Sequence, residues 1–206
     1  MMSATDTTCR VQCAAGQPVP SSPGWRRAAR WGLRFVRNAL AVVGLLFLVY
    51  HFCFEITTVI SGSMAPTLQG EGGPGSDVVL FERVSYWWRK PQRWEVAQYE
   101  TLDHMIVAKR VVGLPGERVA IVDHQPVIDG APAPPPPPLA FLHYYAEARA
   151  NHGRTIDCGD GYFFLGDDSI DSYDSRYEGP MPRSAIRSRA WLILWPPSRI
   201  GFVNAG

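Results

Sequence analysis

The chain contains 206 residues, 46% of them hydrophobic, with 20 basic and 19 acidic side chains and a formal net charge of +1. This length allows about one globular domain with appendages. Because the charges nearly cancel, the composition gives no electrostatic reason to expect nucleic acid as a partner.

The first 34 residues are predicted to form a basic, disordered tail. Residues 1–24 are rich in Ser, Thr, Gly and Pro, which disfavours a packed core. Cys9 and Cys13 lie here without a nearby histidine, a weak metal-binding pattern. The histidines of the chain show no metal-ligand spacing either, so neither a metal nor a cofactor is predicted. The basic character comes from arginines that continue to the start of the next segment: Arg26, Arg27, Arg30, Arg34 and Arg37.

Residues 35–54 are predicted to be a transmembrane signal anchor. As a helix, the sixteen apolar residues 39–54 would span about 24 Å, and extension back to Phe35 brings this close to a hydrocarbon core of about 30 Å. A cleaved signal peptide would need small residues at its end, and residues 53–56 offer none. The preceding arginines predict a cytoplasmic N-terminus, with residues 55–206 across the membrane.

Beyond residue 55 the chain consists of short β-branched and aromatic runs separated by glycine and proline. The predicted fold class is therefore mainly β, and no stretch has a clear helical period. Asp129-Gly130 is predicted to form a turn. The predicted strands include residues 77–81, 117–122, 126–128, 162–165 and 190–195.

Residues 131–159 are predicted to be a variable insertion. They contain five consecutive prolines, Pro134 to Pro138, which favour an extended polyproline spacer in an exposed loop. A docking motif for a protein partner is the alternative interpretation of this run.

A cluster of aromatic and basic residues follows the first predicted strand. Tyr86, Trp87 and Trp88 precede Arg89 and Lys90. Such a cluster suits the membrane–water interface, where aromatic rings lie at headgroup depth and cations meet anionic lipid. Arg93 and Trp94 follow shortly after. Two of the three tryptophans could instead pack in the core, and the sequence leaves both interpretations open.

Two serines flank a glycine in residues 60–68, Ile-Ser-Gly-Ser-Met-Ala-Pro-Thr-Leu, after a β-branched run. A glycine lets the backbone present a serine where a substrate can approach, but serine is a weak nucleophile until a base removes its proton. Lys109 follows the apolar run 105–108, and burial among apolar groups lowers the pKa of a lysine toward neutrality. Ser63 on one strand and Lys109 at the end of another are therefore a candidate nucleophile and base.

A third segment, residues 166–179, is rich in aspartate and serine. Together with three others it resembles, in order and spacing, the sequence boxes of the type I signal peptidases, the membrane-bound serine/lysine leader peptidases of bacteria. Asp168 and Ser169 stand where that family usually has Asn and Arg. The resemblance covers residues 56–120 and 160–202, and the other three matching segments are residues 61–68, 77–79 and 109–116.

The resemblance implies a signal-peptidase-like β catalytic domain with a Ser/Lys dyad. Ser63 would be the nucleophile and Lys109 the general base, while the Ser63 N–H and the Ser61 hydroxyl would form the oxyanion hole. By the same resemblance, Ser172 would orient the lysine. Two ion pairs would support the site: Arg110 with Asp167, and Asp174 with Arg176.

The resemblance also implies the substrate, an exported preprotein whose signal peptide has small residues at −1 and −3. The peptide would bind extended, as a strand added along residues 56–61 and 106–109. The implied location is the bacterial cytoplasmic (inner) membrane, where the protein would contact lipid and serve protein secretion, with the catalytic domain on the outer face. The residues implied to bind the substrate are Thr57, Val59, Ile106, Val107 and Ala108.

Three alternatives were weighed against this assignment. A dedicated processing peptidase of the same clan, such as the conjugative pilin type, shares the dyad but serves one substrate. An inactive, membrane-anchored domain that binds exported peptides would need a lost dyad residue, and both are present. A Ser/His/Asp hydrolase would use His104, and it leaves the four matching segments unexplained.

Overall fold

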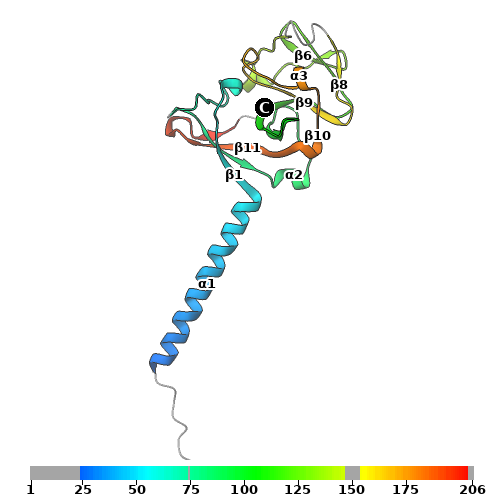
Figure 1. The fold of residues 1–206 in the computed structure, drawn as a ribbon. Helices are drawn as coiled ribbons and strands as arrows, with labels where there is room; N and C mark the ends of the chain where they lie inside the picture. The colour runs from blue at the N-terminus through cyan, green and yellow to red at the C-terminus, as the bar shows by residue number, and fades with distance from the viewer. Residues whose placement is uncertain (1–23, 74, 147–153, 204–206) are drawn as a thin grey trace, which may run out of the picture. The chain divides into compact units, whose positions relative to one another are not determined.

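The computed structural model describes residues 24–73, 75–146 and 154–203 (Figure 1). The predicted disordered segment 1–24, with Cys9 and Cys13, lies outside these residues except for its last position. The chain divides into two compact units, residues 1–45 and residues 46–206, which are described separately.

Helix α1 (Gly24–Cys53) is continuous over 30 residues and has no buried side chain. It begins before the predicted anchor, because the arginine-rich residues 25–34 also include Ala, Leu and Trp and contain no proline. The predicted tail is thus helical from residue 24. Among the described residues, α1 is the one helix long and apolar enough to cross a membrane.

The unit formed by residues 46–206 is mainly β, which confirms the predicted fold class. Its larger sheet is antiparallel, with strand order β1-β2-β11-β3-β4-β9-β10 and β12 paired with β11. The strands are β1 (Phe54–Thr58), β2 (Val78–Glu82), β3 (Val96–Glu100), β4 (Ile106–Gly113), β9 (Gly161–Leu165), β10 (Met181–Pro182), β11 (Ile186–Trp195) and β12 (Gly201–Phe202).

The smaller sheet has the order β7-β6-β5-β8. The predicted turn at Asp129-Gly130 joins β6 to β7, and both residues have positive φ, 49° and 83°, as a type I′ hairpin turn requires. The strands are β5 (Arg118–Val122), β6 (Gln125–Ile128), β7 (Ala131–Pro132) and β8 (Ile156–Asp157).

The segment predicted as an insertion contributes to the core of the smaller sheet. Leu139, Leu142 and Tyr144 are fully buried there against side chains of β4, β5 and β9. The proline run therefore does not stay extended, since Pro137 opens a 3₁₀ turn, η2 (Pro137–Leu139), that turns Leu139 inward. The other short helical elements are η1 (Gly62–Met64), α2 (Ser85–Trp88), α3 (Ser175–Glu178), η3 (Arg183–Ala185) and η4 (Pro197–Arg199).

Candidate functional site

Ser63 lies in the 3₁₀ turn η1 and not on a strand, which corrects the prediction from sequence. Strand β1 ends at Thr58, and the turn closes where the Ala65 N–H donates to the Gly62 carbonyl at 2.8 Å. Ser61, extended at φ −128° and ψ 151°, precedes the turn. Its hydroxyl oxygen is 3.2 Å from that of Ser63, so the two predicted site serines share a hydrogen bond.

Lys109 lies in the middle of β4, because Val111 and Val112 continue the strand to Gly113. The prediction that it ends a strand is therefore wrong. Lys109 lies inside the strand and is buried, with 4% of its surface exposed. Burial lowers the pKa of Lys109 below its ordinary value, the Asp174 carboxylate opposes this shift, and Arg176 adds to it.

The Lys109 amine is held by a chain of three hydrogen-bonded side chains. Its Nζ donates to the Ser172 hydroxyl at 2.9 Å, and that hydroxyl donates to Asp174 Oδ2 at 2.8 Å. Arg176 binds both oxygens of the same carboxylate at 2.8 and 2.9 Å. Since the carboxylate accepts only, the Ser172 proton points to Asp174 and the Ser172 oxygen faces Lys109.

Gly166 lies between these hydrogen-bonded side chains and the turn η1 that carries Ser63. A Cβ at residue 166 would lie 2.1 Å from the Ser172 hydroxyl and 2.6 Å from the Ser63 carbonyl oxygen, so only glycine fits between them. The neighbouring Asp168 N–H donates to that same Ser63 carbonyl at 3.2 Å. Among the described residues no hydrogen bond joins Ser63 to Lys109 directly, and the Asp168 contact joins the turn that carries Ser63 to the loop that follows β9.

The predicted ion pair between Arg110 and Asp167 is also buried. Arg110 and Asp167 have fully buried side chains, and two bonds of 2.7 and 2.6 Å join them. Arg110 also donates to the Trp94 carbonyl at 2.6 Å, and Thr67 binds both partners of the pair. Thr67 was not predicted as a site residue, although it lies in the same sequence box as Ser63.

Ser169 is a further residue that the sequence analysis did not assign to the site. Its hydroxyl accepts from Arg176 at 2.9 Å and from the Tyr145 N–H at 2.8 Å, while Arg176 donates to the Tyr145 carbonyl at 2.8 Å. The segment around Tyr145 thus holds the arginine that neutralises Asp174. The departure from the family pattern at Ser169 was the signal that could have identified it.

The five residues predicted to bind substrate do not form one group. Val59 and Ala108 both pack against the cluster that contains Met64, but Val107 packs against a different cluster. This follows from strand geometry, since neighbouring residues of β4 face opposite sides of the sheet. Ile106 is exposed at the start of β4, and Thr57 is half-buried on β1.

Two strand segments near the site have an edge with no paired strand among the described residues. β1 pairs with β2 alone. Residues 106–109 of β4 pair with β3 alone, because β9 joins β4 only from Arg110 onward. Free N–H and C=O groups on such edges can pair with an added extended peptide.

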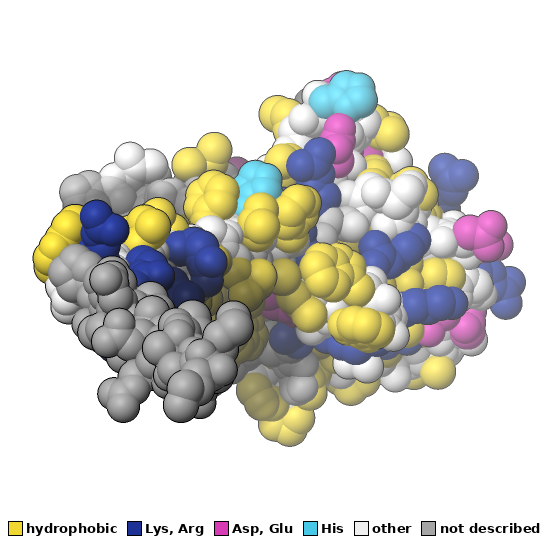
Figure 2. Space-filling model, turned by 90° about the horizontal axis from the view of Figure 1, so that it is seen from below, with side chains coloured by type: hydrophobic (Ala, Val, Ile, Leu, Met, Phe, Trp, Pro, Cys, Tyr) yellow, Lys and Arg dark blue, Asp and Glu magenta, His cyan; other side chains and the backbone are white. Residues whose placement is uncertain are grey.

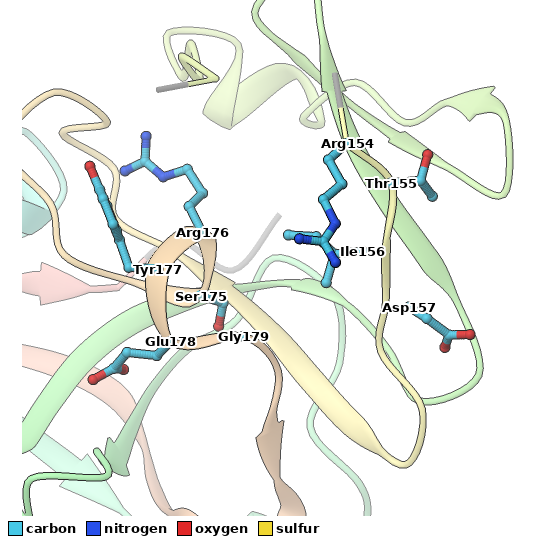
Figure 3. A pocket seen from close by; sticks show the side chains of 9 residues that line it. All are labelled: Arg154, Thr155, Ile156, Asp157, Ser175, Arg176, Tyr177, Glu178 and Gly179. Carbon is cyan, nitrogen blue, oxygen red and sulfur yellow. The ribbon is translucent and has the colours of Figure 1, made fainter. Parts of the chain in front are cut away.

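A separate pocket lies between residues 154–157 and helix α3 (Figure 3). It is lined by residues 154–157 and 175–179, so it includes Arg176 but neither Ser63 nor Lys109. No group of three or more His, Cys, Asp or Glu side chains that could hold a metal ion occurs in the described part of the chain.

The described residues supply a buried amine and two adjacent hydroxyl groups, which are the kinds of group that acyl transfer with an amine base requires. A neutral lysine that donates one N–H to Ser172 keeps its lone pair for the proton of a nearby hydroxyl. The Ser61 hydroxyl, beside Ser63, can donate to an oxyanion formed when Ser63 attacks a carbonyl.

Comparison with known proteins gives a family model and relatives that are described as signal peptidases. The family model described as signal peptidase, peptidase S26, matches residues 32–195. A probable signal peptidase I-2 of Synechocystis sp. is 30% identical over 180 residues, which cover 84% of this chain and 77% of the relative. A signal peptidase I of Leptolyngbya laminosa is 29% identical over 97% of this chain and 93% of its own. Signal peptidase I V of Bacillus subtilis is 30% identical over 74% of this chain and 92% of its own.

The low pKa of Lys109 can be measured directly, because the chain has only two lysines, Lys90 and Lys109. In a Lys90→Gln variant labelled with ¹³C-lysine, the single lysine side-chain signal belongs to Lys109. We expect it to titrate below the free-lysine pKa of about 10.4, because burial disfavours the charged amine. NMR titration of the folded protein gives this value, and a midpoint at or above 10.4 would contradict the site geometry.

Proposed function

Because this chain belongs to the peptidase S26 family of signal peptidases, we propose that it is a membrane-anchored serine endopeptidase that removes signal peptides from exported preproteins with a Ser63/Lys109 dyad. The observation that carries this proposal is the hydrogen-bonded chain from Lys109 through Ser172 to Asp174, on a lysine that is 4% exposed. Such an arrangement favours a neutral amine, the form that can act as a base.

In the proposed reaction the lone pair of Lys109 takes the proton of the Ser63 hydroxyl as the oxygen attacks the scissile carbonyl. The resulting ammonium then delivers this proton to the leaving amine, so the peptide C–N bond breaks and an acyl-enzyme forms. A water molecule, deprotonated by the same lysine, attacks the ester carbonyl. The ammonium then returns this proton to the Ser63 oxygen as the ester C–O bond breaks, which releases the acid and restores the Ser63 hydroxyl. The hydrogen bond to Ser172 keeps the amine oriented through both steps.

The developing oxyanion needs donors that are already in place. We assign this role to the Ser61 hydroxyl and to the Ser63 N–H. In support, the Ser61 hydroxyl oxygen lies 3.2 Å from the attacking oxygen of Ser63. The bond between the Ser63 carbonyl and the Asp168 N–H, at 3.2 Å, restrains the turn that carries Ser63 and directly follows Ser61.

The substrate is proposed to bind as an extended strand between β1 and the first half of β4. The unpaired edges of these two segments support this mode, since main-chain hydrogen bonds would hold the peptide without regard to sequence. Val59 and Ala108 share one cluster near Met64 and are proposed to shape the pocket for the small side chains at −1 and −3.

We propose that α1 anchors the protein in the bacterial cytoplasmic membrane, with residues 1–34 in the cytoplasm and the β unit on the outer face. The length and composition of α1 support a membrane span, and the arginines at its N-terminal end support the orientation. Ser63 follows the end of α1 at Cys53 by ten residues, which keeps the nucleophile near the bilayer where signal peptides emerge.

The dyad predicts the outcome of substitutions at its two members. Ser63→Ala and Lys109→Ala should each abolish preprotein cleavage, and the double variant should be no worse than either single variant, because the two residues act as a unit. Lys109→Arg should also be inactive, since a guanidinium stays protonated. Lys90→Ala, the same change at the other lysine, is the control and should keep wild-type kcat/KM. Substantial cleavage by Lys109→Ala would eliminate the lysine-base mechanism.

The proposed pocket predicts a change of specificity at Ala108. Ala108→Ile adds bulk against the cluster that Val59 also contacts, and each methylene in an apolar pocket changes discrimination by about 1–3 kcal/mol. The variant should therefore reject Val and Leu at −3 more strongly than the wild type, while an Ala-x-Ala substrate is still cleaved. The measurement is kcat/KM for matched substrates with Ala, Val or Leu at −3. Equal selectivity of the two enzymes would remove Ala108 from the pocket.

A further inference from the structure

Arg199, which is not part of the dyad, directs its guanidinium to a carboxylate with no exposed surface, that of Asp77. By contrast, basic side chains lie at the surface on the face of the molecule that Figure 2 shows. Trp87 and Trp88 are 58% and 83% exposed, so packing in the core is wrong for this pair, whereas Trp94 packs against the core of the smaller sheet. Because a buried carboxylate needs a paired charge, Arg199 has a role inside the protein.

Asp77 begins a matching sequence segment that supplies no residue to the dyad. Its main chain closes the loop that carries Ser63, residues 59–69. The Asp77 N–H donates to the Gln69 carbonyl at 2.7 Å, and the Asp77 carbonyl accepts from the Val59 N–H at 2.8 Å. The Asp77 carboxylate also accepts from the Gln69 N–H at 2.8 Å. Both ends of the loop are therefore fixed on one buried residue.

Arg199 holds this carboxylate and the loop at the same time. Its Nε donates to Asp77 Oδ1 at 2.8 Å, and its Nη2 donates to Asp77 Oδ2 at 2.9 Å. The same Nη2 also donates toward the carbonyl oxygens of Thr67 at 3.0 Å and Pro66 at 3.2 Å. These two residues follow Ser63 by four and three positions. A planar guanidinium can meet a carboxylate and neighbouring carbonyls together, which an ammonium cannot do.

The short stretch after Ser63 is thus held from two sides. On the side of the site, the Thr67 hydroxyl contacts both Arg110 and Asp167. On the other side, the Thr67 carbonyl accepts from Arg199, which lies in the segment between β11 and β12. Val203, just beyond β12, packs in the same buried cluster as Met64. The C-terminal segment therefore contacts the serine loop through a polar and an apolar residue.

We propose that Arg199 is a positioning residue for the cleavage reaction. Together with Asp77 it holds the loop so that the Ser63 hydroxyl and N–H keep the geometry that attack requires, and it touches neither substrate nor the reacting atoms. This inference rests on the proposed function, because the loop matters for catalysis only if Ser63 is the nucleophile. A displacement of about 1 Å at the reacting atoms costs about 10²-fold in rate.

The expected effect is on kcat rather than on KM. The proposed substrate edges belong to β1 and to the first half of β4, and these strands are held by their pairing with β2 and β3. Removal of Arg199 leaves that pairing in place, so the substrate should bind as before. The acid limb of kcat/KM should not move either, because Lys109 is held by Ser172 and not by Arg199.

The test compares Arg199→Gln, Arg199→Lys and a control, Arg187→Gln, in the full chain. Arg187 is also an arginine of the C-terminal region, but its side chain is 41% exposed and pairs with Glu100. We expect Arg199→Gln to lower kcat for preprotein cleavage by about 10²-fold with little change of KM. Arg199→Lys should recover part of this loss, since its ammonium can pair with Asp77, and Arg187→Gln should match the wild type. Addition of Asp77→Asn to Arg199→Gln should cost little more, because the two residues act as a unit.

Amide hydrogen exchange on the same variants reports the loop without any substrate. The Ala65 and Leu68 N–H groups are bonded within the loop at 2.8 Å each, and the Val111 N–H of β4 is bonded to Glu95 at 2.8 Å. In Arg199→Gln we expect faster exchange at Ala65 and Leu68 and wild-type exchange at Val111.

Wild-type kcat in Arg199→Gln would overturn the positioning role. Loss of kcat with equally faster exchange at Val111 would overturn it too, because Arg199 would then support the whole fold. If Arg199→Gln does not fold, Arg199→Lys decides in the same way: wild-type kcat overturns the role, and reduced kcat with wild-type exchange at Val111 supports it. A wild-type chain that cleaves no preprotein would instead refute the peptidase function, while the exchange at Ala65 and Leu68 still tests whether Arg199 holds the loop.

Discussion

Lys109 is buried beside a hydroxyl that is itself hydrogen-bonded to a carboxylate, and these surroundings act on its pKa in opposite directions. Burial favours the neutral amine, while Asp174 favours the ammonium. Burial is the larger effect on the Lys109 pKa, and Arg176, which binds both oxygens of Asp174, adds to it by repelling a second positive charge. The site therefore keeps a carboxylate close enough to orient Ser172 while the pKa of Lys109 is still shifted downward.

The two ion pairs also connect the site to both sheets. Arg176 reaches the Tyr145 carbonyl and the Ser169 hydroxyl, in and near the segment that packs on the smaller sheet. Arg110, in β4, binds Asp167 next to Gly166. Removal of one partner of such a buried pair typically costs about 3–5 kcal/mol, because the remaining charge has no compensation. A variant that lacks one partner of either pair would therefore lose activity for two reasons: the fold around the site is less stable, and one charge is missing.

Residue type and spacing indicated Ser63 and Lys109 as a candidate nucleophile and base, whereas Ser172 and the two ion pairs were implied by the resemblance to signal peptidases. The structure joins Lys109, Ser172 and Asp174 by hydrogen bonds and buries both ion pairs. Among the described residues, Ser63 bonds to the Ser61 hydroxyl and to the Asp168 N–H, and not to these three side chains. Roles that depend on close packing could not be predicted. Gly166 is one of many glycines in the sequence, and only the positions of Ser172 and the Ser63 carbonyl reveal why no side chain fits there.

The sequence predicted the strands more reliably than the segments between them. The alternation of β-branched residues located β2, β5, β6, β9 and most of β11 to within a few residues. The proline run was misread as a simple spacer, because its inward turn depends on Leu139, which is buried only when the smaller sheet is present. The prediction that Lys109 ends a strand was also wrong because it depended on tertiary pairing. Strand β9 pairs with β4 from Arg110 onward and so extends β4 past Lys109.

The pH dependence of kcat/KM for preprotein cleavage tests the central claim most directly, because this quantity reports the ionisation of essential groups in the free enzyme. The account predicts an acid limb whose apparent pKa equals the NMR titration midpoint of Lys109, below about 10.4. An acid limb that differs clearly from that midpoint would contradict the claim that buried Lys109 is the base that activates Ser63.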